Sequence, residues 1–118
     1  FDSQQEAINF AHKLQSQGVK SMDVGCMQVN LLHHPKAFTN MADAFNPQSN
    51  VEYAAKFLKS NFETDKSWRK AAAAYHSRTP EYGNQYLGRV YKSWQRIVDR
   101  VRKARLGKGT ADTVQTTA

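Results

Sequence analysis

Two stretches of this chain contain polar side chains whose choice no helical pattern explains. The first, 21–30, includes Gln28, whose amide can both donate and accept hydrogen bonds. The second, 71–77, consists of four alanines followed by Tyr75, His76 and a serine. Among these side chains the imidazole is the one whose charge changes between about pH 5 and 8. Both stretches are therefore candidates for a ligand-binding site, in which contact through the histidine would depend on pH.

Covalent chemistry is an alternative, because the imidazole of His33, His34 or His76 could deprotonate Cys26. A nucleophilic cysteine usually needs a rigid framework of partner groups, which the helical pattern of this chain does not suggest. We therefore rank a cysteine hydrolase well below ligand binding. The histidines, which also include His12, lack a spacing typical of metal ligands. We predict no metal and no cofactor.

Length and composition indicate one ordinary globular domain. A chain of 118 residues with 40% hydrophobic residues can bury a single core. No run approaches the roughly 18 apolar residues that a membrane-spanning helix needs. Charge is uneven: 1–66 carry six Lys/Arg against seven Asp/Glu, whereas 67–118 carry eleven against three. Such a basic end could be a solvated face, or it could attract nucleic acid, an anionic membrane surface or an acidic wall polymer.

Helices are the elements expected to position the two stretches. Ser3 and Glu6 have capping-box spacing and predict a helix start. Asn46-Pro47 predicts a second start, because asparagine accepts from free amides and proline fits the first turn. Ser67 caps a short alanine-rich helix, which we expect to be buried. One apolar stripe should face the core from the second helix: Val51, Ala54, Ala55, Leu58 and Phe62.

The coarse organisation follows from these signals. We predict helices over 4–17, 47–61, 68–75 and 80–107, with no persistent period over 19–40. No alternating strand pattern is longer than a few residues. The sequence therefore predicts an all-α fold, with one domain over 1–106 followed by a polar tail over 107–118.

Three motifs, in one order along the chain, resemble a known family. Gly25-Cys26-Met27-Gln28 resembles the Gly-Leu-Met-Gln motif of the soluble lytic transglycosylases, and Ala73-Ala74-Tyr75-His76 resembles their Ala-Ala-Tyr-Asn motif. Between them, 45–51 and 53–58 are similar to the family's Asp-Pro-x-x-Asn-Ile helix, which ends in Tyr-Leu. The resemblance covers about residues 19–94. It is best to a subgroup that has a Gly-Cys-Met-Gln motif and a longer segment before it.

The resemblance implies a lysozyme-like helical domain that acts on the glycan strands of peptidoglycan. In this family a single glutamic acid protonates the glycosidic oxygen between N-acetylmuramic acid and N-acetylglucosamine. It then deprotonates the muramic C6 hydroxyl, which closes a 1,6-anhydro ring. Because the nucleophile belongs to the substrate, the second carboxyl group of ordinary glycosidases is dispensable. The resemblance also implies a periplasmic or cell-envelope location.

The same resemblance implies a substrate cleft with six lining residues: Asp23, Met27, Gln28, Asn30, Tyr75 and His76. Met27 would pack under a sugar face, and Gln28 would contact an N-acetyl group. Tyr75 would place its hydroxyl near the acid. His76 stands where the family usually has asparagine. Plain structural roles remain open for each of them.

The general acid has no clear counterpart in this sequence. The family's catalytic glutamate precedes a serine and stands about fifteen residues before the motif glycine, a count that leads here to Phe10. Glu6 is followed by Ala7 and has the capping spacing, so it is a weak fallback. We expect Phe1 to lie inside the longer segment of the subgroup. The acid would then lie upstream, and this chain alone would be inactive.

The main competing hypothesis is a non-catalytic binding module. The basic pattern over 82–106 could dock on nucleic acid through phosphate contacts. That reading leaves the stretches 21–30 and 71–77 unexplained, and the chain lacks a helix-turn-helix spacing with base-reading side chains. We therefore expect no nucleic acid partner. A wall-binding protein that keeps the cleft without the chemistry stays open, as does the oligomeric state.

Overall fold

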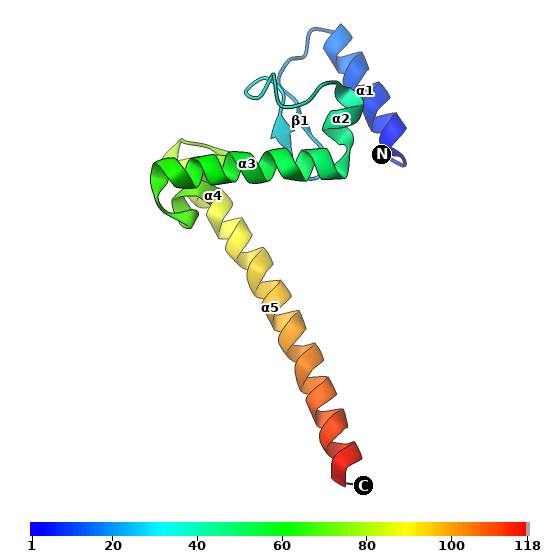
Figure 1. The fold of residues 1–118 in the computed structure, drawn as a ribbon, viewed down its shortest axis with the longest axis vertical. Coiled ribbons are helices and arrows are strands. Elements are labelled where there is room, and N and C mark those ends of the chain that lie inside the picture. The colour runs from blue at the N-terminus through cyan, green and yellow to red at the C-terminus, as the bar shows by residue number, and fades with distance from the viewer. Residues whose placement is uncertain (118) are drawn as a thin grey trace. The chain divides into compact units, whose positions relative to one another are not determined.

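The computed structural model describes the backbone of residues 1–117 and the side chains of residues 1–108. The described chain is mostly helical, which confirms the predicted all-α class (Figure 1). It divides into two compact units, Phe1–Thr64 and Asp65–Ala118, and each is described here by itself. Among the helices described, none is long and apolar enough to cross a membrane.

The first helix, α1 (Gln4–Ser16), begins as the sequence predicts. The Ser3 hydroxyl accepts a hydrogen bond from the Glu6 amide at 3.1 Å, which satisfies one of the free donors of the first turn. The Glu6 carboxylate accepts from the Asp2 amide at 3.1 Å instead of from the Ser3 amide of an ideal capping box. The chain leaves the helix through Gly18, whose φ of +86° suits glycine.

A short hairpin occupies the segment in which no period was predicted, and a short helix follows directly after it. Strands β1 (Asp23–Val24) and β2 (Val29–Asn30) pair antiparallel, with Val24 opposite Val29. Helix α2 (Met41–Phe45) starts at Asn40, whose side chain accepts from the Asp43 amide at 2.8 Å. Both elements are too short to show a period of their own, so the sequence pattern could not reveal them.

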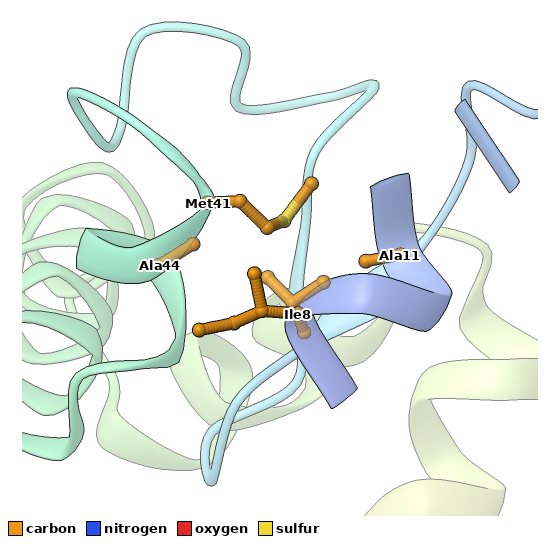
Figure 2. Packing of buried hydrophobic residues seen from close by; sticks show 5 residues of the cluster. Ile8, Ala11, Met41 and Ala44 are labelled. Atoms are coloured by element: carbon orange, nitrogen blue, oxygen red, sulfur yellow. The ribbon is translucent and has the colours of Figure 1, made fainter. Parts of the chain in front are cut away.

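The core of the first unit lies between α1 and α2, as Figure 2 shows, where Ile8 and Ala11 face Met41 and Ala44. Val24 of the hairpin completes this cluster and is 3% exposed. A hydrogen bond of 2.9 Å from the Gln4 side chain to the Phe45 carbonyl also joins the two helices. The hairpin is therefore anchored to the core through its buried valine.

Helix α3 (Pro47–Asp65) begins at the predicted position and runs about one turn further than expected. Asn46 caps it by accepting from the Ser49 amide at 3.1 Å. The predicted apolar stripe is only partly correct, because Ala54 is buried but Val51 is 46% exposed. Two polar side chains are buried in this helix instead, Asn50 and Asn61.

The second unit consists of α4 (Trp68–His76) and α5 (Pro80–Thr117). Ser67 caps α4 as predicted, accepting from the Lys70 amide at 3.2 Å. The helices approach closely where a Cβ atom on Gly83 would lie 3.2 Å from that of Ala73. The expectation that α4 is buried is correct for Ala71, which has no exposure, but wrong for Trp68, which is 57% exposed.

Helix α5 continues past Gly107, where the sequence predicted its end. Glycine costs only about 1 kcal/mol in a helix interior, so it does not have to end one. Gly107 is absent from the positive-φ glycines of the described chain, so it lacks the left-handed conformation of a helix stop. The division into a domain over 1–106 and a tail over 107–118 stays a prediction, and residue 118 lies outside the described residues.

Candidate functional site

The turn Gly25–Gln28 connects the two strands of the hairpin and holds the first predicted motif. The Gln28 amide donates to the Gly25 carbonyl at 3.0 Å and closes the turn. Both of these residues have positive φ, +75° for Gly25 and +53° for Gln28. A non-glycine residue adopts this left-handed conformation only at a cost of about 1–2 kcal/mol. Surrounding contacts must therefore hold Gln28 in place.

Asn50 provides those contacts from the first turns of α3. Its side chain has no exposure, and all of its hydrogen-bonding groups are used. The Nδ2 group donates to the Val24 and Ala44 carbonyls, both at 3.0 Å. Oδ1 accepts from the Met27 amide at 2.9 Å and from the Cys26 thiol at 3.7 Å. One buried amide thus fixes the turn to α2 and α3.

Gly25 is required at its position by space as well as by conformation. A Cβ atom there would fall on the Asn50 side-chain amide and would also lie 3.0 Å from the Ala44 carbonyl oxygen. Its positive φ adds a penalty for any other residue. The glycine of the motif is therefore the residue that allows the Asn50 hydrogen bonds to form.

Two side chains of the turn, Met27 and Gln28, are exposed above this fixed base. Met27 is 41% exposed. The Gln28 Nε2 group donates to the Gly25 carbonyl at 3.0 Å. Cys26 is also exposed as a free thiol, and its Sγ lies against the Asn50 amide oxygen. The turn therefore presents an apolar thioether beside a polar amide whose carbonyl oxygen stays available as an acceptor.

Asp23 and Asn30 flank the turn and pair with each other across the hairpin. The Asn30 Nδ2 group donates to Asp23 Oδ1 at 3.0 Å and to the Ser21 hydroxyl at 3.1 Å. Its Oδ1 accepts from the Leu32 and His33 amides. Because every polar group of the Asn30 side chain has a partner within the chain, its evident role is to hold the hairpin and the turn that follows.

The second predicted stretch lies at the end of α4, in the second unit. His76 is exposed, and its ring stacks on that of Tyr86, with 4.6 Å between centroids and 11° between planes. The Arg89 guanidinium lies 5.9 Å from the centroid of the same tyrosine ring. Tyr75 is half-buried. The imidazole is therefore presented on an aromatic surface of α5.

The structure brings four of the six predicted site residues together in one hairpin: Asp23, Met27, Gln28 and Asn30. The other two, Tyr75 and His76, are adjacent on α4 in the other unit. Sequence reasoning missed Asn50 as a separate site residue, although it lies inside the motif 45–51 and follows the Asn46-Pro47 helix start by only a few residues.

Carboxylates in the described chain are mostly exposed, but Asp43 and Asp65 are half-buried. Asp65 Oδ1 pairs with the Arg78 guanidinium at 3.4 Å, and its Oδ2 is buried without a hydrogen-bond partner in the described part of the chain. All four glutamates are exposed: Glu6, Glu52, Glu63 and Glu81. Hydrogen bonds from the Ser49 side chain and then from Thr39 hold the pKa of Asp43 below its usual value. No group of three or more His, Cys, Asp or Glu side chains among the described residues could hold a metal ion. The described glutamates are all in contact with solvent.

His34, considered above as a partner for Cys26, is engaged elsewhere in the first unit. Its Nδ1 lies 2.8 Å from the Tyr53 hydroxyl, and its ring packs edge-on against Phe57. Burial, followed by the nearby His33, lowers the pKa of His34. The ring also lines a pocket of about 370 Å³ together with His12 and Phe38. These contacts give the imidazole a structural partner.

Comparison with known protein families gives a match. Residues 4–85 match the family model described as the Transglycosylase SLT domain. Searches of curated proteins and of solved structures found no match. The matched range covers more than half of the chain and contains both the Gly25–Gln28 turn and the end of α4. With its helical fold and its glycine-dependent turn, the chain belongs to the transglycosylase SLT domain family.

Proposed function

We propose that this chain is the glycan-binding part of a lytic transglycosylase from the subgroup with a Gly-Cys-Met-Gln motif. Its substrate would be the bond between N-acetylmuramic acid and N-acetylglucosamine in peptidoglycan, and the product a 1,6-anhydro-muramic end. Membership of the SLT domain family supports a peptidoglycan substrate at the level of the family. The bond specificity and a cell-envelope location are parts of the proposal.

The rigid Gly25–Gln28 turn is the observation that carries this proposal. A sugar face offers C–H groups beside hydroxyl and N-acetyl groups, so it is matched by an apolar surface next to an amide. Met27 and Gln28 offer that pair on a turn whose base is fixed by the fully buried Asn50. A site held in its binding geometry before the ligand arrives loses less entropy on binding.

Tyr75 and His76, at the end of α4 in the second unit, are proposed as further glycan contacts. His76 can hydrogen-bond as the family's asparagine does, because each side chain offers a polar nitrogen. For Asp23 and Asn30 we propose a supporting role, because they hydrogen-bond to each other beneath the turn.

We further propose that the general acid is not among residues 1–118. An acid that stays protonated at neutral pH needs an apolar environment that disfavours its charge. The glutamates of this chain are exposed, and Glu6 is engaged in capping α1. A glutamate supplied by a longer protein would then protonate the glycosidic oxygen and deprotonate the C6 hydroxyl. The 118-residue chain should bind glycan without cleaving it.

Binding to purified peptidoglycan sacculi tests the glycan site directly. The Gln28→Ala and Met27→Ala variants should each lower the bound fraction at fixed sacculus concentration severalfold, since each removes one exposed contact. Gln5→Ala is a matched control, because Gln5 is an exposed glutamine on α1 with only a local hydrogen bond to Asn9. Equal binding by all variants would show that the Gly25–Gln28 turn does not contact the glycan.

Mass spectrometry of the soluble products separates the catalytic proposal from a wall-binding protein without chemistry. The chain alone should release no anhydro-muropeptides. A longer protein that carries a Glu-Ser pair before residue 1 should release them, and changing that glutamate to glutamine should stop release while binding is kept. Release of anhydro-muropeptides by the 118-residue chain would refute the proposed absence of the acid. A longer protein that binds but never cleaves would favour the non-catalytic alternative.

A further inference from the structure

Helix α5 carries an exposed apolar stripe beyond its contact with α4. Leu87 is buried at the contact, but Val90, Trp94, Ile97 and Val101 are 39–60% exposed. These exposed residues are three or four positions apart, so they lie within an arc of about 60° on a helix of 3.6 residues per turn. The exposed part of the stripe extends over about 17 Å at 1.5 Å per residue. It begins after residue 85, where the family match ends.

The opposite side of this helix is strongly basic. Residues 86–108 contain eight Lys or Arg and a single acid, Asp99. Most of the cations fall on the helix face opposite the stripe at a spacing of three or four residues: Arg89, Lys92, Arg96, Arg100 and Lys103. They are all exposed. The helix is therefore amphipathic, with an aromatic residue in its apolar face and an excess of positive charge around it.

We propose that this face of α5 docks on an anionic lipid surface. A helix with Trp and aliphatic side chains on one side and Lys or Arg on the other can lie in the membrane interface, with its apolar side between the lipid chains. Indole favours this interface because it has an apolar body and one polar N–H group. Both the stripe and the charge excess are used in this arrangement.

Other occupants account for only one of the two features. A nucleic acid or an acidic wall polymer would neutralise the cations and leave the stripe in water. A second copy of the chain would cover the stripe but would bring two equally basic helices together, which is electrostatically unfavourable. An anionic membrane is complementary to both. The inference is independent of the glycan site, because it uses no residue of the Gly25–Gln28 turn.

Sedimentation of the full 118-residue chain with lipid vesicles tests the proposal. Vesicles of phosphatidylcholine alone are compared with vesicles in which roughly one third of the lipid is phosphatidylglycerol, which makes the surface anionic. We expect strong binding to the anionic vesicles only, with affinity decreasing as salt is raised. In a Trp68→Phe background Trp94 is the remaining tryptophan. Its emission should shift to the blue when the anionic vesicles are added.

Two double variants separate the roles of the stripe and of the charges. Trp94→Gln with Ile97→Gln should weaken binding at least tenfold, because two exposed apolar side chains lose their burial in lipid. Arg96→Gln with Arg100→Gln should weaken it roughly thirtyfold on anionic vesicles, because each cation near the surface contributes about 1 kcal/mol. All four positions are exposed, so the fold should persist, which far-UV circular dichroism checks.

Leu32→Gln with Val51→Gln is the matched control, because these side chains are 48% and 46% exposed in the first unit. The control should bind like the unchanged chain. The proposal is overturned if anionic vesicles do not sediment the chain, if neutral vesicles bind it equally, or if the stripe variant binds normally. A dimer in analytical ultracentrifugation that dissociates in the stripe variant would also overturn it, in favour of a second copy.

Discussion

Replacing Asn50 by leucine should loosen the Gly25–Gln28 turn and destabilise the first unit. Leucine has a similar volume but cannot donate to the Val24 and Ala44 carbonyls or accept from the Met27 amide. A buried polar group left without its partner costs about 1–3 kcal/mol. Val24 and Ala44 are both buried, so water cannot readily replace the lost donor at their carbonyls. The Met27 amide lies on an exposed turn and should recover part of its loss by binding water.

These losses together predict a decrease of about 3–5 kcal/mol in the free energy of unfolding. Whole domains are stable by only about 5–15 kcal/mol, so the first unit should become marginal. Amide hydrogen exchange followed by NMR measures the effect where it arises. Protection of the Met27 amide should disappear first, because its acceptor is removed, and protection of α1 should fall with the loss of global stability.

Asn9→Leu is the control, since Asn9 is exposed on α1 and its side chain accepts only from Gln5. Such a surface change should alter stability by at most about 0.5 kcal/mol. A loss below about 1 kcal/mol in Asn50→Leu, with Met27 still protected, would show that the buried amide does not hold the turn.

Asn50→Asp adds a pH-dependent test of the same contacts. The new carboxylate could still accept from the Met27 amide, but it would face the Val24 and Ala44 carbonyl oxygens and lie fully buried. Both effects raise its folded pKa above the unfolded value of about 4. Stability is therefore highest when the group is protonated and falls as pH rises toward the folded pKa. Urea unfolding should show a smaller deficit at pH 4 than at pH 7, and an equal deficit would contradict the geometry.

Three further predictions use other positions. Gly25→Ala should cost several kcal/mol in urea unfolding, because its Cβ would displace the Asn50 amide, whereas Gly88→Ala, with open space around it, should stabilise by about 0.5–1 kcal/mol. Burial lowers the folded pKa of His34, so the unfolded chain binds a proton more readily and the free energy of unfolding falls as pH drops below about 6.5. The His34→Gln variant should show a smaller fall over the same pH range. Lys66→Gly should stabilise the second unit by about 0.5–1 kcal/mol, because the φ of Lys66 is +56° and glycine adopts this conformation without strain. Both tryptophans lie in that unit, so tryptophan fluorescence during urea unfolding measures the effect.

Helix starts were predictable from the sequence because capping is local chemistry. Ser3 and Ser67 each accept from an amide three residues later, as their spacing indicated. Asn46 does the same before Pro47. These bonds depend on side chains within one turn, so no knowledge of the tertiary structure is needed to expect them.

Elements fixed by distant contacts were not predictable in the same way. The hairpin has two residues in each strand and exists because Val24 joins the core and Asn50 holds the turn. The stripe on α5 has helical periodicity in the sequence, but periodicity cannot tell a buried face from an exposed one. Val90 and Trp94 have the spacing of core positions, and both are exposed.

In the candidate site, the exposed residues could be predicted from the sequence, whereas the buried residue that supports them could not. Met27 and Gln28 could be proposed from the sequence because their side chains carry the chemistry. Asn50 could be noticed only as part of a motif, since a buried asparagine in a helix looks unfavourable until its four hydrogen bonds are known. Its importance lies in groups supplied by residues 6–26 positions away in the sequence.

One buried amide also explains why the first two motifs occur together. Asn50 can reach the turn only if α3 starts at Pro47, which places it in the first turns of that helix. The turn can receive the amide only if position 25 lacks a side chain. Asn46-Pro47, Asn50 and Gly25 are therefore parts of one packing solution, separated in sequence by the loop and α2. A substitution at any of them should move Gln28 although none of these residues is proposed to contact the glycan. In such variants, weaker glycan binding should therefore occur together with lower hydrogen-exchange protection of the Met27 amide. Substitution of Gln28 itself should weaken binding and leave the protection of the Met27 amide unchanged.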